Sequence, residues 1–531
     1  MCRFNSGVSR ILAVVLLTGV IPPGLASDQD ANEPPKPAPP VARIVISPET
    51  THFTEPLQED GLVDVVEAVN RHFGQNISPE HNAAVVLYEV LGPSPAGVRL
   101  SDEFFKTLGM SRPPENGDYF QEYGTWQQTK GRKVSLDDFN RAMAGPWKRN
   151  DLPEIYDWLE ASRPHLDRIA EGTKRPDYFS PLIPPTDAQG RRAGMVNTLL
   201  PGVQMSRALA RAMLCRGMLL LGEGSHMDAW RDFFALHRLG RQIGRSATLI
   251  EHLVGVALET MALEAETRWI EHVQPGVKLA ARVREELQSL PEISSMADAV
   301  DITERAMYID SVLLLSQNRI NLGMLAGAND GVPPVLQQAA TALIDWNSVL
   351  RKGNQWYDRM AAAMRLEDRQ ARQAMLRKVE QELKQAQKEG AAPGKLALAV
   401  LPGLASPILT DAYSSALAAL LLPGINAAQH AEDRQRQNFD NLLVTLTLFS
   451  ALAASGEFPE RLDQLVPQQL MTVPIDRFSG SPLKYRRTAD GFELYSVGKN
   501  ETDDGGRTFG DEKPGDDLVV RISLAKTAPA N

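Results

Sequence analysis

The stretch RAMLCRGMLLLGEGSHMDAWRDFFALHRLGRQI, residues 211–243, holds two segments of helical apolar periodicity separated by Gly222-Glu223-Gly224-Ser225. Such a glycine cluster ends a helix, because glycine adopts backbone conformations that other residues avoid. We therefore predict one helix from Met195 to Leu221, bent near Pro201, and a second from His226 to Ile243.

The helical pattern continues on both sides of this stretch. A third helix is predicted from Thr248 to Ile270. The order of helix, glycine turn and helix resembles tetratricopeptide packing, and Ala229 and Asp232 follow the turn. No second copy occurs at the repeat length of about 34 residues. We expect a mainly α fold: a helical bundle body with tetratricopeptide-like helix packing in part, and a small C-terminal α+β domain. The body is predicted to comprise an N-terminal mostly helical region, a central helical domain, and a long helix with apolar helices, at residues 42–180, 181–345 and 346–430.

The third part of the body is predicted from two features. Gln355 to Glu389 contains neither glycine nor proline and predicts one long helix. Leu396 to Ala428 is strongly apolar, but Pro402, Pro407 and Pro423 divide it into pieces shorter than the roughly 18 residues of a membrane span. We expect buried core helices there and no stable transmembrane span, with a membrane segment as the alternative.

The N-terminus is typical of a secretory signal peptide at residues 1–27. Arg3 and Arg10 form a positive segment before the short apolar run from Ile11 to Ile21, and small residues allow cleavage after Ala26 or Ser27. The proline-rich residues 28–41 are predicted to be a disordered linker. We therefore expect an exported protein of the periplasm or cell envelope, with an uncleaved anchor as the alternative.

Composition narrows the classes of function. The 531 residues carry 56 basic and 66 acidic side chains, a net charge of -10, which argues against a nucleic-acid partner because phosphate binding needs a basic surface. The two cysteines, Cys2 and Cys215, cannot form a disulfide framework.

From Ala431 the pattern changes to α+β. A helix from Ala431 to Ala454 precedes a predicted hairpin, with strands at Pro482 to Thr488 and Phe492 to Val497, and a last strand at Leu518 to Ile522. This order, with the motifs Gly456-Glu457-Phe458-Pro459, Asp476-Arg477-Phe478-Ser479-Gly480-Ser481-Pro482 and Leu494-Tyr495-Ser496-Val497-Gly498, resembles the globular domain of the major pseudopilin of type II secretion systems, protein G. Because the N-terminal fibre helix of that family has no counterpart here, the resemblance of residues 431–531 implies a fold and not fibre assembly.

The whole chain is similar to a group of large exported planctomycete proteins without a known activity. Short pieces carry this looser resemblance, among them Ser47-Pro48-Glu49-Thr50-Thr51, Pro79-Glu80-His81-Asn82-Ala83-Ala84 and His237-Arg238-Leu239-Gly240-Arg241. The resemblance implies export and assigns no reaction.

A calcium site is predicted in the loop before the last strand. Residues 501–517 hold seven carboxylates, which repel one another unless solvent or a cation screens them. Ca²⁺ takes six to eight oxygen ligands with flexible geometry. The pseudopilin resemblance implies calcium in this loop, with an uncharged asparagine where the family has its first loop aspartate. The predicted ligands are Asn500, Asp503, Asp504, Asp516 and Asp517, and a solvated acidic loop without metal is the alternative.

Catalytic motifs are not evident in the sequence. The nine histidines lack metal-ligand spacing and are interpreted as surface or core residues, and Glu264 and Glu266 as solvated surface. Arginines are concentrated in the centre of the chain: Arg207, Arg211, Arg216, Arg238, Arg241 and Arg245. We expect them to bind either an external anion, such as a carboxylate or an anionic wall polymer, or the acids of neighbouring helices. We expect a non-enzymatic protein that binds an envelope or secretion-related protein. The alternative is a periplasmic hydrolase whose site no motif reveals.

Overall fold

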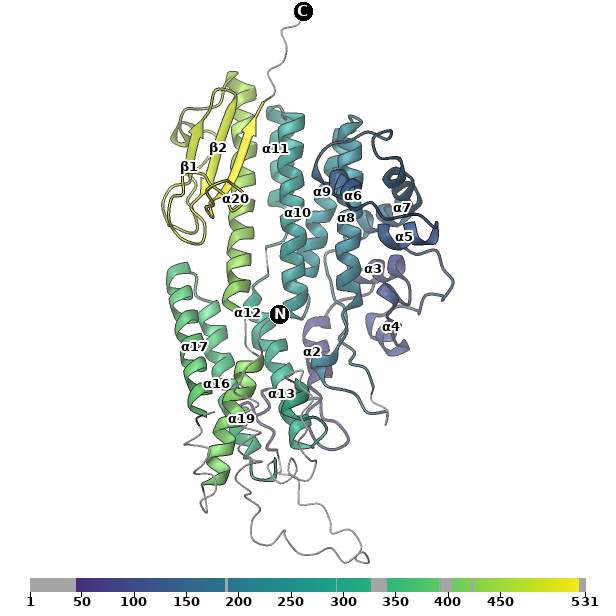
Figure 1. Ribbon diagram of the computed structural model, residues 1–531, viewed down its shortest axis with the longest axis vertical. Coiled ribbons are helices and arrows are strands. Elements are labelled where there is room, and N and C mark those ends of the chain that lie inside the picture. Colours follow the sequence, from purple (N-terminus) through teal and green to yellow (C-terminus); the bar gives the residue numbers. More distant parts are fainter. Residues whose placement is uncertain are drawn as a thin grey trace, which may run out of the picture.

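The structure, a computed structural model, is an elongated helical molecule with a small sheet at one end (Figure 1). The predicted signal peptide and linker lie outside the residues it describes. The described residues are 44–186, 190–292, 294–325, 341–390, 392, 404–421 and 425–524.

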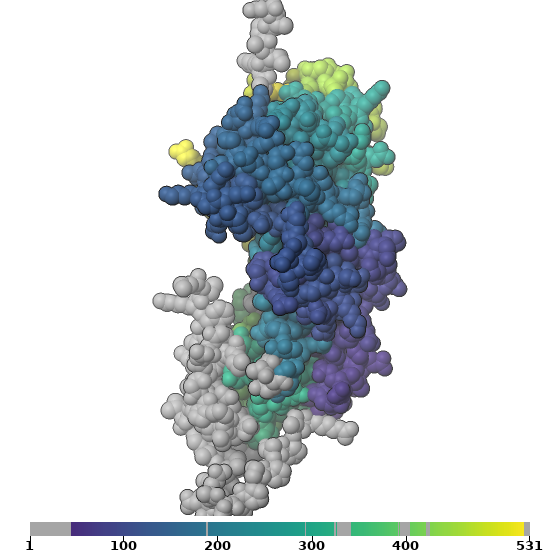
Figure 2. Space-filling view, turned by 90° about the vertical axis from the view of Figure 1, so that its right-hand side faces the viewer, coloured from purple at the N-terminus to yellow at the C-terminus, as the bar shows by residue number. Residues whose placement is uncertain are grey.

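The N-terminal region is built from short helices, and Figure 2 shows these purple and blue residues covering one side of the molecule. Polar side chains start several of them: Asn82, for example, accepts a hydrogen bond from the Ala84 N–H at 3.0 Å. The helices are α2 (Val65–Gly74), α3 (Ala83–Leu91), η1 (Pro95–Gly97), α4 (Asp102–Leu108), α5 (Tyr123–Thr129), α6 (Leu136–Ala144) and α7 (Pro153–Gly172).

The central helices follow the predicted glycine turn closely. They are η2 (Met195–Asn197), α8 (Pro201–Gly222), α9 (His226–Ile243), α10 (Leu249–Val273) and α11 (Val277–Gln288). The prediction of one helix from Met195 is wrong, because α8 begins at Pro201. Proline disfavours a helical conformation in the residue before it, and Leu200 has a ψ of 63°. Thr248 and Glu251 form a capping box that begins α10.

Glycines bring α9 and α10 into unusually close contact. A Cβ atom on Gly255 of α10 would lie 2.5 Å from the Gly244 Cα atom and 2.6 Å from the Gly240 carbonyl oxygen. Any side chain there would therefore force the two helix backbones apart.

We expect Gly255→Ala to destabilise the protein by about 1–3 kcal/mol, because the backbone atoms it meets cannot move without separating the helices. Thermal unfolding measures the loss. Gly124→Ala in α5 is the matched control, since nothing lies within 4 Å of its added methyl group, and it should be neutral or slightly stabilising. Equal melting temperatures for the two variants would contradict the close approach.

The lower half of the molecule in Figure 1 contains the next helices: α12 (Met296–Asp298), the π-helical turn η3 (Ala299–Glu304), α13 (Arg305–Ser316), α14 (Leu322–Leu325), α16 (Trp346–Met364), α17 (Arg369–Gly390) and α19 (Ala405–Leu421). The predicted single helix from Gln355 to Glu389 is wrong: α16 ends at Met364 and α17 runs back beside it. Asp368 starts α17 by accepting the Ala371 N–H at 2.6 Å. Folding back buries the apolar faces of both helices, which one extended helix would expose.

The C-terminal module has the predicted order of helix, hairpin and strand. It contains α20 (Ile425–Ser455), η5 (Leu462–Leu465), β1 (Lys484–Arg487), β2 (Gly491–Ser496) and β3 (Leu518–Ser523). The strands form an antiparallel sheet in the order β1-β2-β3, with Lys484 opposite Tyr495 and Tyr495 opposite Val519. The predicted hairpin and last strand are confirmed.

Helix α20 joins the two halves of the molecule. Its first turns, from Ile425, pack in the core of the lower half, whereas Leu442 to Ala451 share the upper core with α10 and the inner face of the sheet. Residue 431, the predicted start of the module, therefore lies inside a continuous helix. Within the described residues, one helical stretch, Ala405–Ser455, is apolar and long enough to cross a membrane, and its most apolar window is 71% buried. This burial agrees with the prediction of no stable transmembrane span.

Candidate functional site

A cleft of about 720 Å³ lies where α7, α8 and α9 meet beside α11. The glycine turn after α8 sends α9 back along it, and α7 packs on both helices. Charged and aromatic side chains line the cleft, among them Tyr156, Arg163, Asp167, Lys174, Arg216, Glu223, Trp230, Phe234, Arg238 and Glu286.

Most charges on the cleft walls are paired with one another. The Arg216 guanidinium donates to both carboxylate oxygens of Asp232, at 2.6 and 2.7 Å, and to Asp167 at 2.5 Å. Burial raises the pKa of Asp232, although Arg216 opposes that shift. Four other cations of the cleft pair with an acid three or four residues away in the sequence: Arg163, Lys174, Arg231 and Arg282. The Arg216–Asp232 pair is largely buried, whereas the other four pairs are exposed to solvent.

Arg238 differs from the other cations of the cleft. Trp230, Phe234 and Arg238 lie one turn apart on α9: the two rings stack at 6.1 Å, and the guanidinium lies 4.8 Å above the Phe234 ring. The Arg238 Nε donates to the Thr173 hydroxyl at 3.2 Å, and the described part of the chain offers it no ion pair. Burial lowers the pKa of Arg238.

Hydrogen bonds join the ends of α7 and α9 beyond Arg238. One turn further along α9, the Gln242 amide donates to the carbonyl oxygens of Thr173 at 3.0 Å and Arg175 at 2.8 Å. These bonds hold the C-terminal ends of α7 and α9 together. Tyr156 lies ~25 Å from Thr173 along α7, at 1.5 Å per residue. The unpaired guanidinium therefore lies at one end of an elongated cleft.

The six central arginines divide into three kinds. Arg216 and Arg241 bind acids of neighbouring helices, as one of the two sequence interpretations expected. Arg207 and Arg211 are exposed on α8, and Arg245, like Arg238, is half-buried without an ion pair in the described chain.

The acidic loop brings together three of the five predicted calcium ligands. Asp504, Asp516 and Asp517 each place one carboxylate oxygen within 4.8 Å of the others. The Asp516 Oδ1 atom is buried and has no hydrogen-bond partner within the described residues. Asp517 is held by the Gly506 N–H at 2.7 Å, and burial raises its pKa.

The other two predicted ligands have different positions. The Asn500 side chain donates to Asp504 Oδ2 at 3.0 Å and turns its own oxygen to the Thr502 N–H at 2.6 Å. Asp503 faces away from the cluster, because it accepts from the Tyr495 hydroxyl at 3.2 Å and lies 3.4 Å from the Lys484 Nζ.

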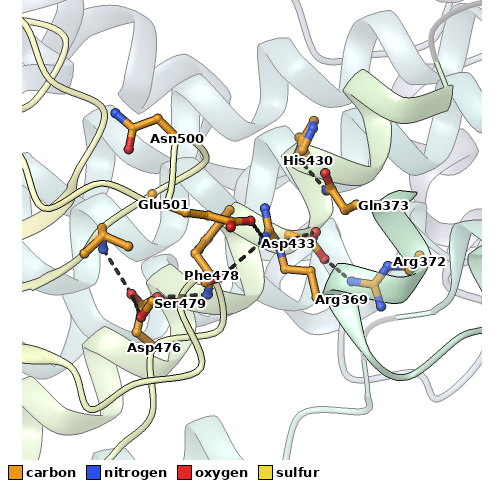
Figure 3. Close-up of polar contacts among 12 residues, drawn as sticks. Arg369, Arg372, Gln373, His430, Asp433, Asp476, Phe478, Ser479, Asn500 and Glu501 are labelled. Carbon is orange, nitrogen blue, oxygen red and sulfur yellow. Dashed lines mark hydrogen bonds and ion pairs between the residues drawn. The ribbon is translucent and has the colours of Figure 1, made fainter. Parts of the chain in front are cut away.

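A polar junction joins this loop to the helical body (Figure 3). Arg369 at the start of α17 donates to the Glu501 carboxylate at 2.7 Å, and its guanidinium lies 4.3 Å from the centre of the Phe478 ring. Asp433 of α20 lies 3.3 Å from the Arg369 Nε and accepts from Arg372 at 2.7 Å. Arg369 thus connects α17, α20 and two loops of the module.

Asp476 orders the module side of this junction. Its carboxylate accepts four hydrogen bonds, from the Phe478 and Val497 N–H groups at 2.9 and 3.1 Å and from the Ser479 and Ser496 hydroxyls at 2.8 and 2.6 Å. This buried aspartate belongs to the motif that begins at residue 476, so its role is to fix the loop before the hairpin.

A buried ionic cluster lies between α9, α10 and α20. The His237 Nδ1 atom lies 3.1 Å from Glu266, and its Nε2 atom 3.4 Å from Glu259. Glu259 also accepts from the Arg241 guanidinium and, at 2.6 Å, from the Gln435 amide. His237 and Glu266 are 0% exposed, so the prediction of a solvated Glu266 is wrong, whereas Glu264 is exposed as predicted.

This cluster was missed in the sequence, although its spacing is regular. His252, Glu259 and Glu266 recur every seven residues on α10, which places them on one face of the helix. His252 lies 3.4 Å from Glu432 of α20 and extends the same stripe. Polar residues spaced seven apart in an otherwise apolar helix are the sequence pattern that indicates such a buried cluster.

No family, curated protein or solved structure in the comparisons matches this chain. The cleft and the acidic loop therefore carry the functional argument by their own geometry.

Proposed function

We propose that this chain is an exported, non-enzymatic binding protein of the cell envelope, and that the cleft between α7, α8 and α9 receives a segment of a partner protein. The observation that carries the proposal is the half-buried Phe234 ring, which stacks on the buried Trp230 and lies beneath the unpaired Arg238 guanidinium. Aromatic and arginine side chains contribute most to protein recognition.

Two features disfavour a hydrolase with a serine, cysteine or histidine nucleophile in this cleft. The residues that line the cleft include no histidine, serine or cysteine in the part of the chain described. Cys215 is fully buried, and that burial raises the pKa of its thiol, which disfavours the reactive thiolate.

The C-terminal module supports a role other than fibre formation. The N-terminal half of α20 is packed inside the helical body, and Asp433 on it is engaged by Arg369 and Arg372. A helix packed in this way leaves only a narrow exposed face, around Ala427 and Arg434, for assembly with other copies. We propose that the module is a fixed, pseudopilin-like part of the binding protein.

An array of random heptapeptides with free C-termini, probed with the full mature chain, tests the binding proposal. We expect bound peptides to lose binding to Phe234→Ala, which removes the aromatic surface, and to retain it with Leu136→Ala, an exposed residue of α6. Circular dichroism establishes that both variants fold. Peptides that bind both variants equally, or no bound peptides, would overturn the proposal.

We also propose that the acidic loop holds Ca²⁺ through Asp504, Asp516 and Asp517. Three carboxylates around the unpartnered Asp516 Oδ1 atom fit a hard cation, which backbone carbonyls and water complete. The bound ion would offset the repulsion among these acids and stiffen the loop that Glu501 ties to Arg369.

Calcium should stabilise the full mature chain against thermal unfolding relative to chelator. Free calcium at 100 times its dissociation constant adds about 2.7 kcal/mol to the free energy of unfolding. Asp516→Asn should abolish the increase in melting temperature, and Glu512→Gln, an exposed acid of the same loop, should retain it. A melting temperature that is the same in millimolar calcium and in chelator would remove the metal site.

A further inference from the structure

We infer that the cleft recognises the C-terminal carboxylate of its partner segment, and that Arg238 is the residue that binds it. This inference rests on the proposed binding function and adds the chemistry of the ligand. It begins from the one cation of the cleft that has no ion pair in the described chain.

The Arg238 guanidinium is prepared to take a planar anion. Its Nε atom is held by Thr173 at 3.2 Å and one face is held by the Phe234 ring, so the two terminal nitrogens keep a fixed direction. A carboxylate accepts two parallel hydrogen bonds from such a fork. Burial disfavours the free guanidinium, the Glu171 and Glu286 carboxylates offset that cost only in part, and an anionic ligand relieves the remainder.

The other charges of the cleft favour a single negative charge over a polyanion. Seven acids line it beside six cations, and five of those cations are already paired. An anionic wall polymer would meet these acids along its length, whereas one carboxylate at Arg238 avoids most of them.

The position of Arg238 selects a chain end. The bonds from Gln242 to Thr173 and Arg175 join the ends of α7 and α9 directly beyond it. A segment that enters from the Tyr156 end must therefore stop at Arg238. Its last side chains would lie beside the half-buried Phe234 ring, so we expect an aromatic or aliphatic C-terminal residue.

Fluorescence anisotropy with the full mature chain tests this inference. The probes are N-terminally labelled hexapeptides that end in Leu-Phe, prepared as the free acid, as the C-terminal amide, and as an amide with an internal glutamate. We expect the free acid to bind at least ten-fold more tightly than either amide. Arg238→Gln should abolish this preference and Arg238→Lys should restore part of it. Arg211→Gln, which removes an exposed arginine of α8 outside the cleft, should leave it unchanged.

The outcomes separate this inference from the proposed function. Equal affinities for acid and amide that both fall in Phe234→Ala would overturn the carboxylate inference and leave the binding cleft in place. An internal glutamate that matches the free acid would overturn recognition of the chain end. Binding that Phe234→Ala does not weaken would overturn the proposed function itself.

Discussion

Glu259→Gln is expected to cost about 3–5 kcal/mol of unfolding free energy. The carboxylate is 2% exposed and joins three helices, because Arg241 of α9 and Gln435 of α20 both donate to it. Its loss leaves the Arg241 guanidinium, which is 5% exposed, without a counter-charge. Removing one partner of a buried pair costs far more than removing an exposed charge.

Urea unfolding followed by circular dichroism measures this cost, with Glu264→Gln as the matched control. Glu264 lies on the same helix, is exposed, and should change the stability by less than about 0.5 kcal/mol. Adding Arg241→Met to Glu259→Gln should restore part of the loss, because the unpaired buried charge is then gone. Equal midpoints for Glu259→Gln and Glu264→Gln would contradict the role of the cluster.

The helices of the centre were predictable because local signals set their ends. The cluster Gly222 to Ser225 ends α8, and the Thr248 capping box begins α10, each within a residue or two of its expected position. The hairpin of the C-terminal module was predictable for the same reason. The end of a helix or strand depends on residues that are adjacent in the sequence, so the sequence pattern alone is enough to predict it.

Tertiary packing decided the features that were mispredicted. No glycine or proline separates α16 from α17, yet the chain turns at Arg365 to Asp368, because folding back buries Met360 and Leu376 together with α19. Glutamate is normally a surface residue, but Glu266 is buried because His237 faces it from another helix. The partner of a buried charge lies far away in sequence, so spacing on one helix identifies only half of the pair.

The same limit applies to the candidate sites. The acidic loop is continuous in sequence, and three of its five predicted ligands do meet. The cleft combines α7, α8 and α9, and Arg238 differs from Arg216 only because Asp232 and Asp167 lie beside the latter. A density of arginines could therefore be seen in the sequence, but which one lacks a partner could not.

Loss of the His237 proton is expected to lower the stability by about 2 kcal/mol between pH 7.5 and pH 9.5. Burial alone would lower the pKa of His237, but Glu266 and Glu259 outweigh it and raise the pKa to about 9. The unfolded chain has a histidine pKa of about 6.5. A pKa that is higher in the folded state stabilises the protein fully below pH 6.5, and this contribution disappears as the pH rises through 9.

Unfolding free energies at pH 7.5 and 9.5 measure this loss. The two carboxyls that face the His237 imidazole belong to α10, and Arg241 lies beside the imidazole on α9. The Phe439 ring of α20 covers the imidazole, so no solvent competes for its proton. Burial also raises the pKa of Glu251 and Glu304, to about 7, and their effect on stability is complete below this window. His237→Gln should remove this part of the difference between the two pH values and leave the part that comes from ionisation of the Cys215 thiol in the unfolded chain. His272→Gln, which replaces an exposed histidine, should preserve the full difference. The same pH dependence in both variants would mean that His237 is neutral in the folded protein, and the cluster would then be held by Arg241 alone.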